Sequence, residues 1–364
     1  MPSTHATYHV TRAINDWLTT LADNTTLCVA FSGGVDSTVL LHALSQQTHL
    51  SIQAVHVNHQ LHPDSADWAT HCVRVANRWG VACETKNITV QSDAGDSVEA
   101  LAREKRYDVL KKYVKENTVL VTAHHQQDQA ETFLLQALRG SGLAGLASMP
   151  AEKPFFLGVL ARPLLTVSPE SITAYAKENQ LTWIDDPSNE STDFDRNYLR
   201  HNVLPVLLTR WPSACQTLVR SVNHVQSGLV LQNDLAEQDL QSMLIHDRWV
   251  ETVDAIKGAM RISVWLALSA DRQRNVLRVW LQSLSIPMPS QAKCEAICLQ
   301  MQARPDANPC ISWGDVSVRR YRDTMYAMTT LPEKTQEKRQ TRKQTYQAEG
   351  VPPWLRDCDI SSTI

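Results

Sequence analysis

The segment "LCVAFSGGVDSTVLLHAL", residues 27–44, constrains the fold more than any other part of the chain. A short apolar run ends at Phe31, two glycines follow, and apolar residues then recur at helical spacing. This pattern predicts a buried strand that turns directly into a helix near Asp36. Glycines permit a tight turn and the close approach of a ligand, and a helix N-terminus attracts anions. The segment therefore suits phosphate, although a plain turn capped by Asp36 or Ser37 is the competing interpretation.

The same alternation of strand and helix continues along the N-terminal part of the chain. Apolar strand patterns occur at residues 27–31, 52–57, 81–88, 119–122 and 156–160, and helical patterns lie between them, one of them at residues 128–138. Strands that alternate with helices in this way predict an α/β fold with a doubly wound parallel sheet covered on both faces. After residue 213 the sequence pattern is mainly helical to about residue 285, and "VSVRRYRDTMYAM" is strand-like.

The chain length predicts more than one domain. A chain of 364 residues is too long for one ordinary domain. We expect domains at residues 1–212, 213–330 and 331–364, the last comprising a polar linker and a short end domain.

Composition excludes several classes of protein. The net charge is −3, so contacts with nucleic acid would have to come from local basic patches. No two of the eight cysteines form C-x-x-C, which leaves zinc ribbons and thioredoxin-like motifs unsupported. The N-terminus lacks the pattern of a signal peptide, and no stretch is apolar for the length of a membrane span. We therefore expect a cytoplasmic protein that does not enter membranes.

The glycine loop lacks the lysine of the Walker loop and carries an aspartate instead. "SGGVDS" between a strand and a helix resembles the PP-loop of the N-type ATP pyrophosphatases, which cleave ATP between the α and β phosphates. The resemblance implies ATP as cofactor, with Asp36 as a ligand of the Mg²⁺ that neutralises the phosphates. The implied nucleotide-binding residues in the loop are Ser32, Gly33, Gly34, Val35, Asp36 and Ser37.

Three further stretches place polar side chains where the sheet is expected to bind ligands. "VHVNHQL" puts His56 at the end of the second strand, where open parallel sheets hold ligands. "SVEALAREKRYDVL" puts Arg103 and Arg106 on one helix, and "VTAHHQQDQAET" puts His124 at a strand end. Asp128 and Glu131 follow three residues apart on the next helix. Taken singly, each stretch is compatible with a solvated polar surface or with helix-end stabilisation.

Together these stretches closely resemble the tRNA(Ile)-lysidine synthetase family. That family carries "HVNHGL", a helix with "EAxAR…RY", "HHxDDQxET" and "DPSNxxxxxxRNxxRxxxxP". The last pattern stands here as "DPSNESTDFDRNYLRHNVLP", residues 186–205, and "GVPPWLRD" near the end resembles the C-terminal domain of the family. The resemblance spans essentially the whole chain.

The resemblance implies an enzyme that modifies cytidine 34 of the tRNA(Ile) with anticodon CAU. ATP adenylates the C2 oxygen with release of pyrophosphate, and free L-lysine then displaces AMP to form lysidine. It implies Mg²⁺ or phosphate organisation by Asp36 and Asp128, and binding of the lysine ammonium by Glu131. It further implies nucleotide contact by His56 and His124, stabilisation of phosphate charge by Arg103 or Arg106, and contact of Arg196 and Arg200 with phosphate or RNA. Residues 213–330 would then bind substrate tRNA, and the oligomeric state stays open.

Two departures keep alternatives open. Gln127 stands where the family has the first aspartate of "DDQxET", and the chain ends at Ile364, which predicts a truncated C-terminal tRNA-binding domain. Local basic stretches at residues 319–322 and 338–343 are candidates for RNA contact or for ordinary solvated surface. The alternatives are a non-catalytic tRNA-binding homologue and another PP-loop tRNA modifier, such as a 2-thiolation enzyme.

Overall fold

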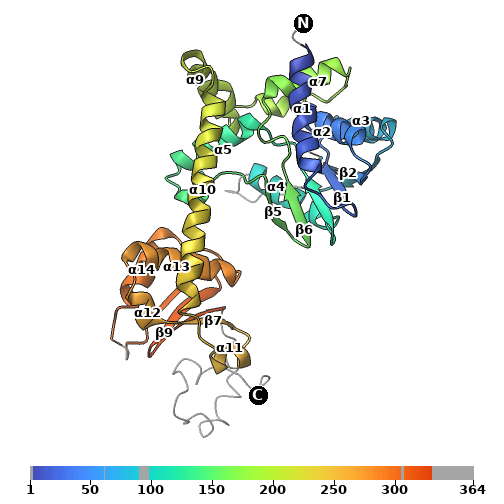
Figure 1. Ribbon diagram of the computed structural model, residues 1–364. Helices are drawn as coiled ribbons and strands as arrows, with labels where there is room; N and C mark the ends of the chain where they lie inside the picture. Colours follow the sequence, from blue (N-terminus) through green and yellow to red (C-terminus); the bar gives the residue numbers. More distant parts are fainter. Residues whose placement is uncertain (1–2, 61, 90–97, 305–306, 330–364) are drawn as a thin grey trace. The chain divides into compact units, whose positions relative to one another are not determined.

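The computed structural model describes residues 3–60, 62–89, 98–304 and 307–329 (Figure 1). The chain divides into two compact units, Met1–Ser227 and Gly228–Ile364. The expected boundary at residue 213 stays a prediction. The expected end domain at residues 331–364 lies outside the described residues.

The first unit is built on a six-stranded sheet in the order β3-β2-β1-β4-β6-β5. Five strands are parallel: β1 (Thr26–Ala30), β2 (Ser51–Asn58), β3 (Ala82–Asn87), β4 (Thr118–Val121) and β6 (Gly158–Ala161). The register pairs Leu27 with Ile52 on one side and with Val119 on the other. The predicted parallel α/β sheet is therefore confirmed.

Both faces of the central strands of this sheet are buried, as their near-continuous apolar sequences require. On one face Leu27 and Val29 pack in a core with side chains from α1 (Ser3–Leu18), α2 (Val35–Gln47), α3 (Ser65–Arg78) and α7 (Pro169–Glu178). On the other face Cys28 and Leu120 pack with Leu110 from α4 (Val98–Lys111). Successive side chains of β1 therefore point to opposite faces of the sheet and pack in two different cores.

The fifth predicted strand is half of a hairpin. Residues 156–160 were expected to form one strand, but Phe156 and Leu157 form the turn between β5 (Glu152–Phe155) and β6. β5 runs antiparallel to β6 at the sheet edge and contains Pro154, a residue that sheets accept mainly at edges. The alternating pattern could not reveal β5, because its first two residues, Glu152 and Lys153, are exposed and charged.

Helical segments follow the carboxyl ends of the strands. α5 (Gln126–Leu138) follows β4, and α6 (Leu143–Leu146) follows the glycine-rich stretch. Residues 187–210 form a 3₁₀ turn (Pro187–Glu190), α8 (Asp195–Tyr198), a π-helical turn (Leu199–Val203) and α9 (Leu204–Arg210). In the π turn the N–H of Leu204 donates to the carbonyl of Leu199, five residues earlier. Pro205 has no N–H to give to the preceding turn, which favours this wider spacing.

The second unit contains a four-stranded antiparallel sheet in the order β7-β10-β9-β8. Its strands are β7 (Ile256–Arg261), β8 (Cys310–Trp313), β9 (Val316–Tyr321) and β10 (Thr324–Thr329). One face packs in a core with α12 (Ile262–Leu266), α13 (Ala270–Ser283) and α14 (Gln291–Gln300), and the other with α11 (Arg248–Thr252). The long helix α10 (Ala214–Gln241) runs across the division between the units.

The predicted helices of this region are present, but β7 and β8 were not expected. β7 lies within residues 213–285, which were expected to be mostly helical, and carries Gly258 at its centre. A Cβ at Gly258 would lie 2.8 Å from Leu284 Cδ1, so the glycine permits close packing on the end of α13. In the described part of the chain, no helix is long and apolar enough to cross a membrane.

Candidate active site

The loop between β1 and α2 is held in shape by the hydroxyl of Ser37. Ser37 Oγ accepts from the N–H of Gly33 at 3.1 Å, donates to the carbonyl of Gly34 at 3.0 Å, and lies 3.0 Å from Ser32 Oγ. Ser32 Oγ in turn accepts from the N–H of Gly34 at 3.4 Å. The N–H groups of the first turn of α2 have no partner within the helix. The loop is therefore preorganised, and the amides at the start of α2 are available to an anion.

This loop borders two adjoining cavities. The larger, about 550 Å³, lies over the carboxyl ends of β1 and β2 and is lined by Phe31, His56, Trp68 and Ile184, among others. The smaller, about 180 Å³, is lined by Asp36, Ser37, His124 and Asp128. Arg106, Ser32 and Gly34 line both. An apolar pocket that narrows to a charged one suits a nucleotide, whose base is flat and apolar and whose phosphates are charged.

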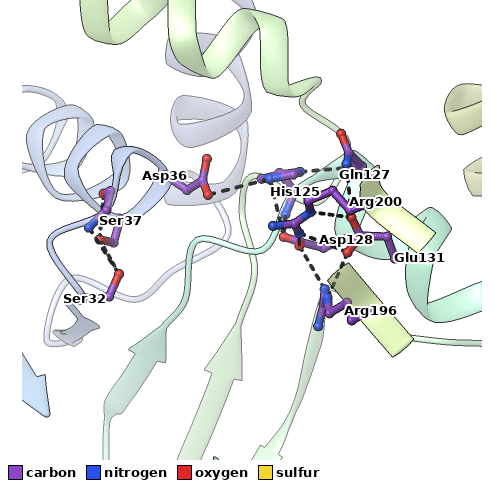
Figure 2. Close-up of polar contacts among 10 residues, drawn as sticks. Ser32, Asp36, Ser37, His125, Gln127, Asp128, Glu131, Arg196 and Arg200 are labelled. Carbon is purple, nitrogen blue, oxygen red and sulfur yellow. Dashed lines mark hydrogen bonds and ion pairs between the residues drawn. The ribbon is translucent and has the colours of Figure 1, made fainter. Parts of the chain in front are cut away.

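Two carboxylates and two guanidinium groups form a compact cluster beside the smaller cavity (Figure 2). Arg196 donates from Nη2 to Asp128 Oδ1 at 2.9 Å and from Nε to Glu131 Oε2 at 2.8 Å. Arg200 donates from Nε to Glu131 Oε1 at 2.8 Å and from Nη2 to Asp128 Oδ1 at 3.1 Å. The side chain of Glu131 is fully buried, so its charge depends on these partners.

The four charges balance formally, and the pKa values of Asp128 and Arg200 are shifted by their neighbours. Burial alone would raise the pKa of Asp128, but His125, Arg196 and the N–H of His125 hold it below its usual value. Burial alone would lower the pKa of Arg200, but its contacts with Glu131 and Asp128 raise it. Asp128 is therefore charged at neutral pH, and the two carboxylates hold Arg200 in its charged form.

Asp36 and His124 complete the smaller cavity. Burial raises the pKa of Asp36, and the nearby His125 ring opposes that rise. Burial lowers the pKa of His124 to about 3, so its ring is neutral, and its Nδ1 lies 2.8 Å from Thr122 Oγ1. His124 faces the cavity, although protein surrounds most of its ring.

His125 was not among the predicted site residues, but the structure puts it at the centre. Its Nε2 lies 3.7 Å from Asp36 Oδ2 and 3.7 Å from Asp128 Oδ2. The signal available in the sequence was its position immediately before α5, where it serves as the N-cap. Gln127, in the first turn of α5, donates from Nε2 to Glu131 Oε1 at 3.1 Å.

The other predicted site residues differ in how close they lie to the cavities. His56 is buried, with Nδ1 2.9 Å from the carbonyl oxygen of Phe31, so this ring also ties the ends of β1 and β2 together. Arg106 lines both cavities, whereas Arg103 is exposed, and its guanidinium lies 5.3 Å from the centre of the Tyr107 ring. Arg196 and Arg200 were expected to face phosphate or RNA, but their guanidinium groups engage carboxylates.

The carboxylate oxygens suit Mg²⁺ bound together with phosphate. Asp36 Oδ2 and Asp128 Oδ2 lie on either side of one histidine nitrogen, at the same distance from it. Within the described ranges, no group of three or more His, Cys, Asp or Glu side chains could hold a metal ion by itself. Mg²⁺ commonly binds through one or two carboxylates plus substrate phosphates and water, which is the donor set this cavity offers.

In the second unit, the arginines of the basic stretch at residues 319–322 differ in burial. Arg320 is buried, and its guanidinium donates to the carbonyls of Met301 and Ala303 at 2.5 Å and 2.6 Å. This arginine therefore stabilises the fold and is not available to RNA. Arg322 is exposed and lies 5.2 Å from the centre of the Tyr321 ring. The second basic stretch, residues 338–343, lies outside the described residues.

Comparison with known proteins gives matches over both units. The PP-loop domain family matches residues 2–207, and the TilS substrate binding domain family matches residues 260–326. A tRNA(Ile)-lysidine synthase of Coxiella burnetii is 39% identical over 319 residues, covering 86% of this chain and 69% of that protein. The enzyme of the same name from Yersinia pestis is 40% identical over 329 residues, covering 88% and 69%.

A solved structure shares the fold of the first unit. The U34-tRNA thiolase NcsA of Methanococcus maripaludis, with its [4Fe-4S] cluster, aligns with a TM-score of 0.51 and 16% identity. The alignment covers 61% of this chain and 79% of that one. At this identity the similarity concerns the fold alone.

Proposed function

Because the chain belongs to the tRNA(Ile)-lysidine synthase family, we propose that it forms lysidine at cytidine 34 of the tRNA(Ile) with anticodon CAU. The C2 oxygen of the cytidine attacks the α-phosphorus of ATP, and pyrophosphate leaves. The amine of free lysine then attacks C2, AMP leaves, and the amine gives up a proton. The modified base pairs with A in place of G, so the tRNA carries isoleucine identity.

The observation that carries this proposal is that the smaller cavity beside the loop is also lined by Asp128, a member of the carboxylate–guanidinium cluster. The cavity of about 180 Å³ has Ser32 and Ser37 on one side and Asp128 on the other. The amides at the start of α2 and the two hydroxyls suit the pyrophosphate that departs. Arg106 borders both cavities and would stabilise charge on the phosphates. The larger cavity would receive the adenosine.

We assign Mg²⁺ to the two carboxylates that face this cavity. Asp36 and Asp128 would hold it, and when bound it neutralises charge on the phosphates. The assignment explains why the loop carries an aspartate where other phosphate loops carry a lysine. Asp36 would attract the phosphates through the cation that it would hold.

Lysine is proposed to bind where the carboxylates meet the arginines. Both oxygens of Glu131 accept hydrogen bonds, from Arg196, Arg200 and Gln127. An incoming ammonium can reach Glu131 only by replacing one of these donors. A guanidinium released in this way becomes free to contact phosphate, so the expected phosphate contact of Arg196 or Arg200 belongs to the substrate-bound enzyme. The released proton would pass to a nearby carboxylate or phosphate.

The two alternatives are less well supported. A 2-thiolation enzyme shares the fold, but the matches over most of the chain are to lysidine synthases. A non-catalytic homologue would lack chemistry at this site, yet Asp36, Asp128 and Glu131 are in place. We further propose that the protein acts in the cytoplasm, where tRNA and ATP are available, with the second unit contributing to tRNA binding.

The test is transfer of radioactive lysine to tRNA(Ile) bearing CAU, in the presence of ATP and Mg²⁺. We expect label in the tRNA and release of AMP and pyrophosphate in equal amounts. The same tRNA with uridine at position 34 is the control and should receive no label. Absence of transfer from folded protein at saturating ATP would exclude the enzyme and leave the tRNA-binding homologue.

A further inference from the structure

The ring of His125 lies between two carboxylates that come from different parts of the sheet. Asp36 follows β1 at the start of α2, and Asp128 follows β4 in the first turn of α5. His125 Nε2 is 3.7 Å from Oδ2 of each, and the histidine side chain is only 7% exposed (Figure 2). Within this cluster, His125 is the side chain that lies beside both carboxylates.

The hydrogen bonds of His125 fix both its ring and its tautomer. Nδ1 accepts from the N–H of Gln127 at 3.2 Å, so Nδ1 carries no proton and Nε2 carries one in the neutral ring. The N–H of His125 donates to Asp128 Oδ2 at 2.9 Å, which completes a capping box at the start of α5. The Nε2–H dipole therefore points toward the two carboxylates and cannot turn away without loss of the cap.

A distance of 3.7 Å is longer than a hydrogen bond, so the N–H does not belong to either carboxylate alone. The dipole favours negative charge on both sides and opposes their mutual repulsion. Loss of the donor would leave two carboxylates facing each other across a cavity, with no other group between them at Nε2. Asp128 would keep its bonds to Arg196, Arg200 and the N–H of residue 125, whereas Asp36 would lose the neighbour that fixes its distance from Asp128.

We propose that His125 is a positioning residue that holds Asp36 and Asp128 at the spacing needed to receive the ATP phosphates and their Mg²⁺. This rests on the proposed function of the two carboxylates. Nδ1 caps α5, and Nε2 lies between the two carboxylates. The ring therefore fixes the position of Asp36, after β1, relative to the start of α5. The competing interpretation is that His125 only caps the helix.

Two substitutions separate the nitrogens. The side-chain oxygen of asparagine occupies the place of Nδ1, so His125→Asn keeps an N-cap acceptor and removes the Nε2 donor. The amide nitrogen of glutamine occupies the place of Nε2, so His125→Gln keeps that donor and loses the cap. Ser168→Ala is the control, because Ser168 caps α7 through its hydroxyl and lies outside the carboxylate cluster.

The measurements are the dissociation constant of ATP at several Mg²⁺ concentrations, by equilibrium dialysis, and the melting temperature. For His125→Asn we expect a melting temperature within about 2 °C of wild type and Mg²⁺-dependent ATP binding weakened about tenfold or more. For His125→Gln we expect a melting temperature lower by about 2–4 °C, as for Ser168→Ala, and recovery of most of the affinity.

The opposite pattern would overturn the proposal. If both variants lose affinity only in proportion to their loss of stability, or if His125→Asn binds ATP as wild type does, the ring is a cap and nothing more. These binding measurements do not need lysine transfer. A wild-type protein without transfer, in which the two variants still differ in ATP binding, would refute the proposed function and leave the positioning role intact.

Discussion

Two adjacent glycines in the loop after β1 are under different constraints. Gly33 has φ +87°, a region that side chains rarely adopt, and a Cβ there would lie 2.6 Å from Ile184 Cδ1 and 2.7 Å from Cys72 Sγ. Gly34 has φ −69° and ψ 166°, and a Cβ there would meet no atom closer than 3.7 Å. Only Gly33 is required by the backbone and by its neighbours.

We therefore predict that Gly33→Ala lowers the free energy of unfolding by about 1–3 kcal/mol. It should also weaken ATP binding, because the N–H of Gly33 is part of the hydrogen-bonded loop. Gly34→Ala is the matched control and should stay within about 0.5 kcal/mol of wild type. Urea unfolding of the two variants gives the comparison, and equal losses would contradict this account of the loop.

Gln127 provides a prediction about charge at one position. Its amide donates to Glu131 Oε1 at 3.1 Å, beside two guanidinium groups that already balance the two carboxylates. Gln127→Asp would add a negative charge in the first turn of α5, where helices accept one readily. We expect stronger attraction for the lysine ammonium and a several-fold lower KM for lysine, on the order of 1 kcal/mol of binding.

Gln127→Asn is the control for this prediction, since it shortens the side chain in the same way without a charge. Steady-state lysine incorporation at saturating ATP and tRNA separates the two variants. An unchanged KM in Gln127→Asp would mean that the charge at this position has no part in binding lysine.

At the scale of elements, the sequence predicts regular structure well and irregular structure poorly. The strands at β1 to β4 and the helix α5 lie within two residues of their predicted bounds. For β1, β2 and β4 the reason is that their apolar side chains pack in buried cores. The β5–β6 hairpin and β7 were not identified, since their positions depend on contacts with distant residues such as Thr118 and Leu284.

The same limit applies to the candidate site. The motifs identify Asp36, Asp128 and Glu131, but spacing along the chain could not show that Arg196 and Arg200 neutralise the latter two. These arginines are 65 to 72 residues from the carboxylates, and the contact depends on how residues 187–210 return to α5. His125 was overlooked because the pattern gives no sign that its ring lies between the first turns of α2 and α5.

The π turn before Pro205 gives a prediction at this scale. Pro205→Ala supplies an N–H that could donate to the carbonyl of His201, four residues earlier, and thus favours an ordinary α-helix. Rewinding would rotate Arg200 relative to Arg196 and break its bonds to Glu131, which are 2.8 Å and 3.0 Å long. We expect lysine incorporation to fall about tenfold or more while the helical content is retained, because catalytic groups tolerate little displacement.

Pro169→Ala is the matched control, because Pro169 stands in the first turn of α7, where the missing N–H has no intrahelical partner. It should leave incorporation within a factor of about two, a change of less than 0.5 kcal/mol. Retained activity in Pro205→Ala would show that the π turn does not set the position of Arg200.

At the scale of the whole molecule, the two units carry different parts of the proposed reaction. The loop, both cavities and the carboxylate cluster all lie in Met1–Ser227. The segment that matches the substrate binding domain family, residues 260–326, lies in Gly228–Ile364. Nucleotide chemistry and tRNA affinity should therefore respond to substitutions in different units.

We predict that Asp36→Ala abolishes lysine incorporation, because the loop loses its proposed Mg²⁺ ligand, while tRNA binding measured by filter retention changes by less than about twofold. Arg322→Ala should have the converse effect, since Arg322 is exposed beside Tyr321 in the second unit. It should weaken tRNA binding and reduce the slope of log K against log salt by about one, as expected for one lost phosphate contact. ATP binding should be unchanged in Arg322→Ala.

Arg320→Ala gives the contrast within the same stretch, because the buried guanidinium of Arg320 donates to backbone carbonyls. This variant should lower the stability of the fold without changing the salt dependence of tRNA binding. If Asp36→Ala impaired tRNA binding as strongly as Arg322→Ala, this division of function between the units would be wrong.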